Sequence, residues 1–172
     1  KKYDLIVTFG GFDENNIIEC VLKVLTNISK SIKTKIILGP ATIKTKKIEE
    51  LGKKSRKFTT IINQTSNMAN EINLSKFGLC AGGITTYEFA AKKVPFGIIS
   101  QVQHQVVTAK EWEKQKMGIN LGKINNQTSK KIEKFLNDIL NKKITLNQKK
   151  NIVDGLGSKR VALEIKKILE KN

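Results

Sequence analysis

The sequence has few of the residues that build metal centres and disulfide frameworks. Its 172 residues include one histidine and two cysteines, with no CxxC pair and no histidine cluster, so no metal site is expected. Cys20 and Cys80 lie within apolar patterns, which indicates buried thiols in a cytoplasmic protein. No apolar run approaches the ~20 residues that span a membrane, and no signal-peptide pattern opens the chain.

Arginine and aromatic residues are also scarce, although the chain is strongly basic. The net charge is +17, from 32 Lys and Arg against 15 Asp and Glu, but Arg56 and Arg160 are the only arginines and aromatic residues make up 6%. Nucleic-acid readers rely on arginine for bidentate contacts and on aromatic rings for stacking. The composition therefore favours a solvated lysine surface, and a basic nucleic-acid-binding module stays open as an alternative of a different class.

What the sequence does have is a regular alternation of strand-like and helix-like segments. Apolar runs predict strands at 3–9, 35–38, 58–62, 77–81, 96–99 and 118–122. Helical spacing separates them at 15–28, 45–54, 66–74, 85–92 and 104–116, and three more helices are expected at 128–140, 146–154 and 158–170. This alternation predicts one α/β domain over residues 1–172, a three-layer, doubly wound, six-stranded parallel sheet with C-terminal helices.

Glycines gather where the predicted strands end. Gly10–Gly11 follows the first strand, Gly39 the second and Gly82–Gly83 the fourth. In a parallel sheet these ends share one edge, where ligands bind near the switch in strand order. Plain turn punctuation is the alternative interpretation.

The segment 81–88, AGGITTYE, is the most informative of these strand ends. A glycine turn that leads from a strand into a helix leaves the first helical amides free for an anion such as phosphate. Glu88 follows Ile84 by about one helical turn, so its carboxylate is placed to accept hydrogen bonds from sugar hydroxyls. The alternative is a strand–helix turn with an exposed glutamate.

Other nucleotide and catalytic motifs are absent from the sequence. There is no GxGxxG after the first strand, no GxxxxGK[ST] loop and no GxSxG elbow. A phosphoacceptor receiver needs an aspartate after the third strand, where Asn63 stands.

Five segments together resemble a known family: 7–13 (VTFGGFD), 67–69 (NMA), 81–88, His104–Gln105 and 154–161 (DGLGSKRV). They look like the Rossmann-like C-terminal lobe of two-lobed glycosyltransferase-B proteins. The likeness is greatest to the UDP-sugar hydrolase of the pseudaminic acid pathway and its spore-coat-polysaccharide relatives, and it extends to the peptidoglycan N-acetylglucosaminyltransferase. It covers about residues 4–165. The segment 154–157 is also read as a turn between two helices.

The resemblance implies a role for each matching residue. Glycines and amides would hold the diphosphate, the loop after the third strand would border the uracil, Glu88 would accept from the ribose, and the loop after the fifth strand would face the sugar. The implied ligand-binding residues are Gly10, Gly11, Phe12, Asn67, Met68, Gly82, Gly83, Ile84, Thr85, Glu88, His104 and Gln105.

Several of these residues have simpler interpretations or depart from the family. Met68 is typical of a core residue, Asn67 of a helix cap, and His104 of a capping or exposed position rather than a general acid or base. Phe12 and Ile84 stand where the family often has serine, so two possible hydroxyl contacts are lost.

The function implied by the resemblance is binding of a UDP-sugar in cell-surface polysaccharide or nonulosonic acid biosynthesis. The enzyme would be a hydrolase that uses neither metal nor cofactor, with a glycosyltransferase proper as the alternative. The chain enters its first strand almost at once, without an initiator Met, so we expect it to be a piece of a longer polypeptide. In such an enzyme the main catalytic base belongs to an N-terminal lobe that is outside this sequence, so the chain alone is expected to bind UDP without turnover.

Overall fold

A six-stranded parallel sheet forms the centre of the computed structural model, which describes residues 1–28, 30–55, 58–144 and 152–170. The spatial order is β3-β2-β1-β4-β5-β6, and every neighbouring pair is parallel. The predicted fold class is therefore confirmed. The strands are β1 (Tyr3–Thr8), β2 (Thr34–Ile37), β3 (Thr59–Ile62), β4 (Ser75–Ala81), β5 (Phe96–Ser100) and β6 (Gly118–Lys123).

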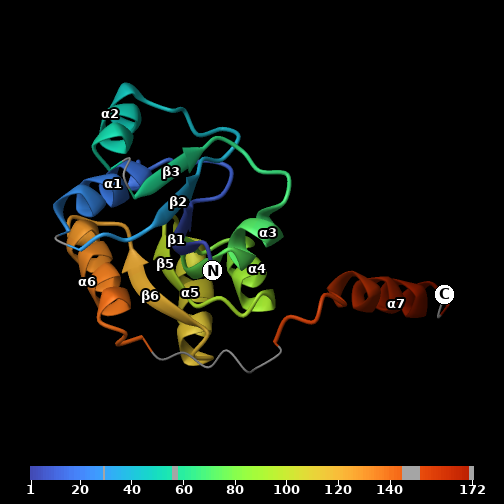
Figure 1. Ribbon diagram of the computed structural model, residues 1–172. Helices are drawn as coiled ribbons and strands as arrows, with labels where there is room; N and C mark the ends of the chain where they lie inside the picture. Colours follow the sequence, from blue (N-terminus) through green and yellow to red (C-terminus); the bar gives the residue numbers. More distant parts are fainter. Residues whose placement is uncertain (29, 56–57, 145–151, 171–172) are drawn as a thin grey trace.

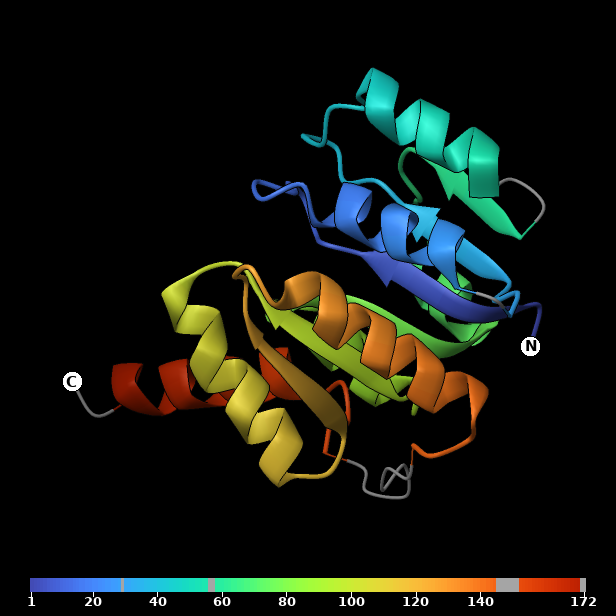
Figure 2. The same cartoon turned by 90° about the vertical axis from the view of Figure 1, so that its left-hand side faces the viewer.

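Helices cover both faces of the sheet (Figures 1 and 2). One face packs against α1 (Ile17–Asn27), α2 (Lys46–Ser55) and α6 (Thr128–Leu140), and the other against α3 (Met68–Asn73), α4 (Thr85–Ala91) and α5 (Gln103–Lys114). Both faces of the sheet are apolar, and β1 is an example: Leu5 and Val7 pack in the first layer and Ile6 packs in the second. Successive side chains of a strand point to opposite faces, so an apolar run supplies both layers.

A buried aspartate fixes the start of α1 and, with it, the loop after β1. The Asp13 carboxylate accepts hydrogen bonds from the amides of Ile17 at 2.9 Å and Ile18 at 2.8 Å. Burial raises the pKa of Asp13, more strongly than these two hydrogen bonds lower it. Asn16 precedes the helix in the left-handed region with φ 52°. The helix therefore begins two residues later than its apolar spacing predicted.

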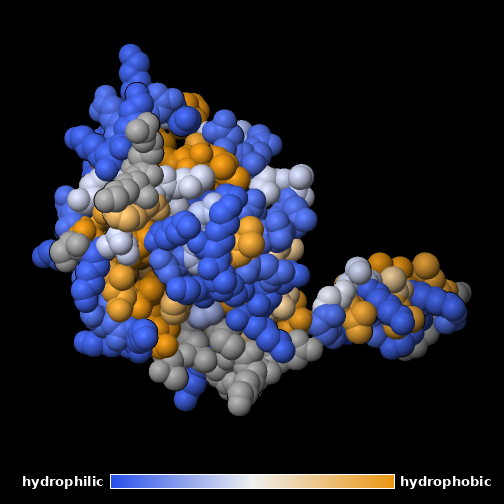
Figure 3. Space-filling view, viewed as in Figure 1, coloured by the Kyte–Doolittle hydropathy of each residue, from blue (hydrophilic) through white to orange (hydrophobic). Residues whose placement is uncertain are grey.

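The C-terminal segment differs most from expectation. The predicted helix 146–154 falls largely on residues 145–151, outside the described part of the chain, and 152–154 are not helical. α7 (Gly157–Leu169) forms where it was predicted, but it stands away from the body and buries none of its residues (Figures 1 and 3). The turn 154–157 therefore leads from the body into a projecting helix.

Candidate functional site

The carboxyl edge of the sheet brings the predicted glycine loops together. Because all six strands are parallel, the loops after β1, β2, β4 and β5 emerge on the same edge. β1 and β4 are neighbours although two strands separate them in sequence, so the switch in strand order lies between the Gly10–Gly11 loop and the Gly82–Gly83 corner. That is the position at which doubly wound sheets bind ligands.

The β1 loop is braced from the side by the loop after β2. A Cβ at Gly39 would lie 1.9 Å from the Gly10 carbonyl oxygen, and the Ala41 amide donates to the Gly11 carbonyl at 2.9 Å. Gly10 has φ +76°, a conformation that favours glycine. Gly10 and Gly11 remain exposed, and the Phe12 side chain is 54% exposed. The loop thus presents backbone and one apolar ring at the edge.

The corner between β4 and α4 has open space on its outer side. No heavy atom lies within 4 Å of a Cβ built on Gly83, and Ile84 is 82% exposed. Among the residues that the structure describes, no acceptor takes a hydrogen bond from the amides of Gly83, Ile84 or Thr85. The Thr86 hydroxyl donates to the Gly83 carbonyl at 2.7 Å and fixes the corner from within. Three amides are therefore free to meet an acceptor from outside.

Glu88 lies one helical turn beyond this corner, as its spacing predicted. Its side chain is half-buried and makes no hydrogen bond or ion pair with the rest of the described chain. The Glu88 charge is close enough to Cys80 to add to the effect of burial, which is the main cause of the raised pKa of that thiol. The Glu88 carboxylate is therefore available to accept hydrogen bonds from a ligand.

The loop after β5 closes the edge from the other side and contains a residue that the sequence did not single out. Gln101 donates through Nε2 to the Phe9 carbonyl at 3.3 Å, and its amide donates to Gln105 Oε1 at 2.9 Å. A Cβ at Gly82 would lie 2.8 Å from the Gln105 backbone oxygen. Gln105 is thus engaged in holding the corner, whereas His104 is exposed at the start of α5. Nothing in the local sequence distinguishes Gln101 from an ordinary polar loop residue.

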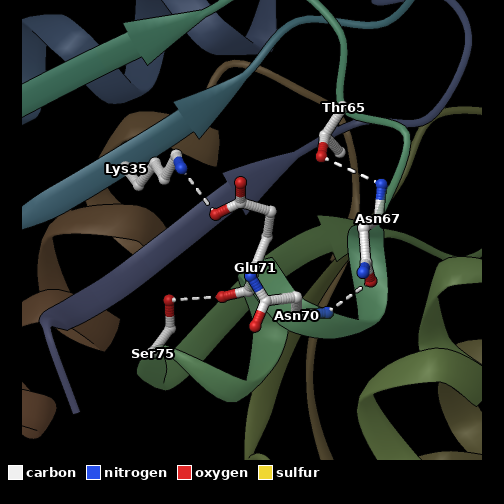
Figure 4. Close-up of polar contacts among 6 residues, drawn as sticks. All are labelled: Lys35, Thr65, Asn67, Asn70, Glu71 and Ser75. Atoms are coloured by element: carbon white, nitrogen blue, oxygen red, sulfur yellow. Dashed lines mark hydrogen bonds and ion pairs between the residues drawn. The ribbon is translucent and has the colours of Figure 1, made fainter.

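The two predicted residues after β3 have structural roles in this chain (Figure 4). Asn67 Oδ1 accepts from the Asn70 amide at 3.0 Å, which makes Asn67 the N-cap of α3. Met68 packs against the second core cluster and borders a hollow of about 240 Å³ that Gly10 also lines. A Lys35–Glu71 ion pair at 2.5 Å holds α3 against the sheet. The simpler interpretations of Asn67 and Met68 are therefore supported, and both still lie at the carboxyl edge.

Among the residues that the structure describes, no group of three or more His, Cys, Asp or Glu side chains could hold a metal ion. None of the helices with described residues combines the length and the apolar character needed to cross a membrane.

Comparisons with known proteins identify the family and the fold of this chain. The family model described as "Glycosyltransferase family 28 C-terminal domain" matches residues 5–165. The spore coat polysaccharide biosynthesis protein SpsG of Bacillus subtilis (strain 168) is 30% identical over 122 residues, which is 69% of this chain and 35% of SpsG.

Two solved structures show the same fold. MurG of Acinetobacter baumannii has a TM-score of 0.69 and 14% identity, covering 84% of this chain and 43% of MurG. S. aureus MnaA, solved with UDP, has a TM-score of 0.70 and 16% identity, covering 98% and 47%. The chain thus spans about a third of SpsG and less than half of MurG and MnaA. It belongs to the glycosyltransferase family 28 C-terminal domain family and has the Rossmann-like fold of a glycosyltransferase-B C-terminal lobe.

Proposed function

We propose that this chain binds UDP-sugars through the corner between β4 and α4, as one lobe of an enzyme of cell-surface polysaccharide biosynthesis. The observation that carries the proposal is the set of unpaired amides at Gly83, Ile84 and Thr85 beside open space, with the unpartnered Glu88 one turn further on. Membership of a glycosyltransferase C-terminal domain family implies a nucleotide-sugar donor. The likeness to SpsG and to MnaA, which was solved with UDP, supports the polysaccharide pathway and the uridine base.

Each part of the corner has a distinct task in this proposal. The amides would donate hydrogen bonds to the diphosphate oxygens, and they would stabilise the negative charge that grows there as the sugar leaves. The Glu88 carboxylate would accept hydrogen bonds from the ribose hydroxyls. Gly10 and Gly11 would allow the diphosphate or distal sugar to approach the backbone closely, while Met68 and the Asn67 loop would border the uracil.

The remaining site residues would act on the sugar rather than on the nucleotide. Phe12 and Ile84 add apolar surface where hydroxyl groups are common in the family, so we expect them to affect which sugar is accepted. His104 is exposed at the start of α5, and we expect it to contact the sugar. We assign no catalytic base to this chain, because the chemistry needs groups from the other lobe.

Calorimetric titration of the chain with UDP tests the proposal. Glu88→Ala should raise the Kd for UDP by about 5- to 150-fold, equivalent to about 1–3 kcal/mol for the lost partner. The matched control is Glu50→Ala, because Glu50 is an exposed glutamate on α2 away from this edge. Absence of heat and of any thermal shift at millimolar UDP would count against the proposal. Binding of RNA or DNA that is lost as salt is added, and that UDP does not compete with, would favour the nucleic-acid alternative.

Hydrolysis and transfer are separated by the fate of the sugar. The enzyme with both lobes is incubated with UDP-sugars, and the released UDP and free sugar are measured. Free sugar in equal amount to UDP, without any acceptor, supports the hydrolase. UDP release that depends on an added acceptor supports a glycosyltransferase.

A further inference from the structure

The side-chain amide of Gln101 has one atom that the described chain leaves unpaired. Its Nε2 donates to the Phe9 carbonyl at 3.3 Å, which fixes the orientation of the amide because a carbonyl accepts and cannot donate. The other end, Oε1, is buried and accepts no hydrogen bond from the residues that the structure describes, and the neighbouring Ser100 hydroxyl is buried in the same way. A buried polar atom without a partner lowers stability, so the stability of the fold alone does not explain an amide at this position.

The contact between Gln101 and Phe9 spans the carboxyl end of a third strand. Gln101 follows β5 and Phe9 follows β1, and β4 lies between these two strands in the sheet. Neighbouring strands are about 4.8 Å apart, so the Gln101 side chain reaches across the point at which β4 turns into the Gly82–Gly83 corner. Gln101 thus connects the loop on one side of this corner to the loop on its other side.

The backbone of Gln101 is tied to the corner itself. Its amide donates to Gln105 Oε1 at 2.9 Å, and the Gln105 backbone oxygen lies 2.8 Å from the position of a Cβ on Gly82. The loop after β1 has no direct tie of this kind, because no hydrogen bond within the described chain joins residues 9–12 to residues 82–85. Gln101 therefore links the two segments that face the ligand.

We propose that Gln101 is a positioning residue that holds the Gly10–Gly11 loop at a fixed distance from the β4–α4 corner, so that both segments bind the same diphosphate. The inference rests on the proposed function, in which Glu88 binds the ribose and the corner amides bind phosphate. The Gly10–Gly11 loop belongs to the neighbouring strand, β1, and is assigned the phosphate farther from the ribose. Gln101 then determines how strongly the site prefers a nucleoside diphosphate to a nucleoside monophosphate, without touching the ligand itself.

The competing explanation is that Gln101 only braces the loops. Replacement by Met separates the two explanations, because Met has a similar length and no hydrogen-bond donor. Gln101→Met removes the hydrogen bond to Phe9 and also removes the unpaired Oε1, and these two changes act in opposite directions on stability. The Tm of Gln101→Met should therefore stay within about 4 °C of the Tm of the unchanged protein, although the loop after β1 has lost its tie.

Calorimetric titration of the enzyme with both lobes, with UDP and with UMP, tests the proposal. In Gln101→Met the Kd for UDP should rise about fivefold or more, while the Kd for UMP should stay within about twofold of its original value. Gln101→Leu removes the donor with a different apolar shape and should give the same result, so that the loss follows the donor rather than the packing. The matched control is Gln103→Met, because Gln103 is exposed at the start of α5 and accepts from Lys123 Nζ at 3.3 Å; it should keep both affinities.

Three outcomes would overturn the proposal. The first is a rise of the Kd for UDP and the Kd for UMP by the same factor in Gln101→Met, together with a Tm lowered by more than about 10 °C, which would assign Gln101 a bracing role alone. The second is an unchanged ratio of the two Kd values in Gln101→Met, or the same change of ratio in Gln103→Met. The third is equal affinity of the unchanged enzyme for UDP and UMP, because the loop after β1 would then not hold a second phosphate. An unchanged enzyme that binds neither nucleotide refutes the proposed function itself, so the two failures are distinguishable.

Discussion

Two neighbouring glycines at the β4–α4 corner should respond in opposite ways to the same substitution. A Cβ at Gly82 would lie 2.8 Å from both the Cβ and the carbonyl oxygen of Gln105, so α5 would have to move. A Cβ at Gly83 would meet no heavy atom within 4 Å, and Gly83 is not in the left-handed region. The pair Gly82→Ala and Gly83→Ala therefore separates support of the corner from contact with a ligand.

The expected sizes follow from these distances. Overpacking by one methyl group against backbone costs about 1–3 kcal/mol, so Gly82→Ala should lower Tm by about 2–12 °C in a domain of this size. Gly83→Ala restricts the unfolded chain and should leave stability unchanged or raise it by up to about 1 kcal/mol. If a phosphate oxygen binds the corner amides, the new methyl group stands in its path. Loss of one charged hydrogen bond then weakens UDP binding by about 10- to 150-fold.

Thermal unfolding without ligand, followed by calorimetric titration with UDP, measures both quantities on each variant. The reasoning is refuted if Gly83→Ala binds UDP within twofold of the unchanged chain, because the amides would then not contact the ligand. A loss of stability in Gly83→Ala equal to that in Gly82→Ala would mean that the open side of the corner is filled in solution.

Three further predictions concern groups that support the edge. Asp13→Ala leaves two amides at the start of α1 without their acceptor and should cost about 1–3 kcal/mol in urea unfolding. Burial raises the pKa of Asp13 in the folded chain above 3.8. The contribution of Asp13 to stability should therefore be largest below pH 3.8 and should decline as pH rises through the folded pKa. Glu71→Ala strands the Lys35 ammonium, whose side chain is only 11% exposed, and should cost about 3–5 kcal/mol, part of which Lys35→Met should restore if the stranded charge is the cause. Cys80 is fully buried and its thiol pKa is raised, so Ellman's reagent should not modify it in the folded chain at about pH 8. The reagent should react slowly with the half-buried Cys20, and it should modify both thiols in urea. Rapid modification of two thiols without urea would contradict the packing.

The fold was predictable because its signal is repeated in every strand and helix. Alternation of short apolar runs with helical spacing required crossovers, and these determined a parallel sheet. The ends of elements were less predictable, since single contacts decide them. β4 begins at Ser75, two residues before its apolar run, because Ser75 pairs with Tyr3 of β1. α3 begins at Met68 because Asn67 caps it.

The candidate site was predictable only in its position. Parallel topology placed the glycine loops at one edge, and helical spacing placed Glu88 one turn from the corner. Gln101 was missed because its role depends on the Phe9 carbonyl, 92 residues away in sequence, and no local pattern encodes that contact. The exposure of α7 was missed for a related reason, since an amphipathic pattern indicates that a face is covered and does not identify the covering surface.

The glycines at this edge show why residue type alone cannot separate support from recognition. Gly10 is required by its backbone, with φ +76°. Gly39 is required by packing, because a Cβ there would lie 1.9 Å from the Gly10 carbonyl oxygen. Gly11 and Gly83 have neither constraint, since their φ angles are outside the left-handed region and no atom lies within 4 Å of their Cβ positions. We expect a glycine that the folded chain does not require to serve a ligand. Of these two, Gly83 carries one of the unpaired corner amides, so its substitution should separate binding from stability most cleanly.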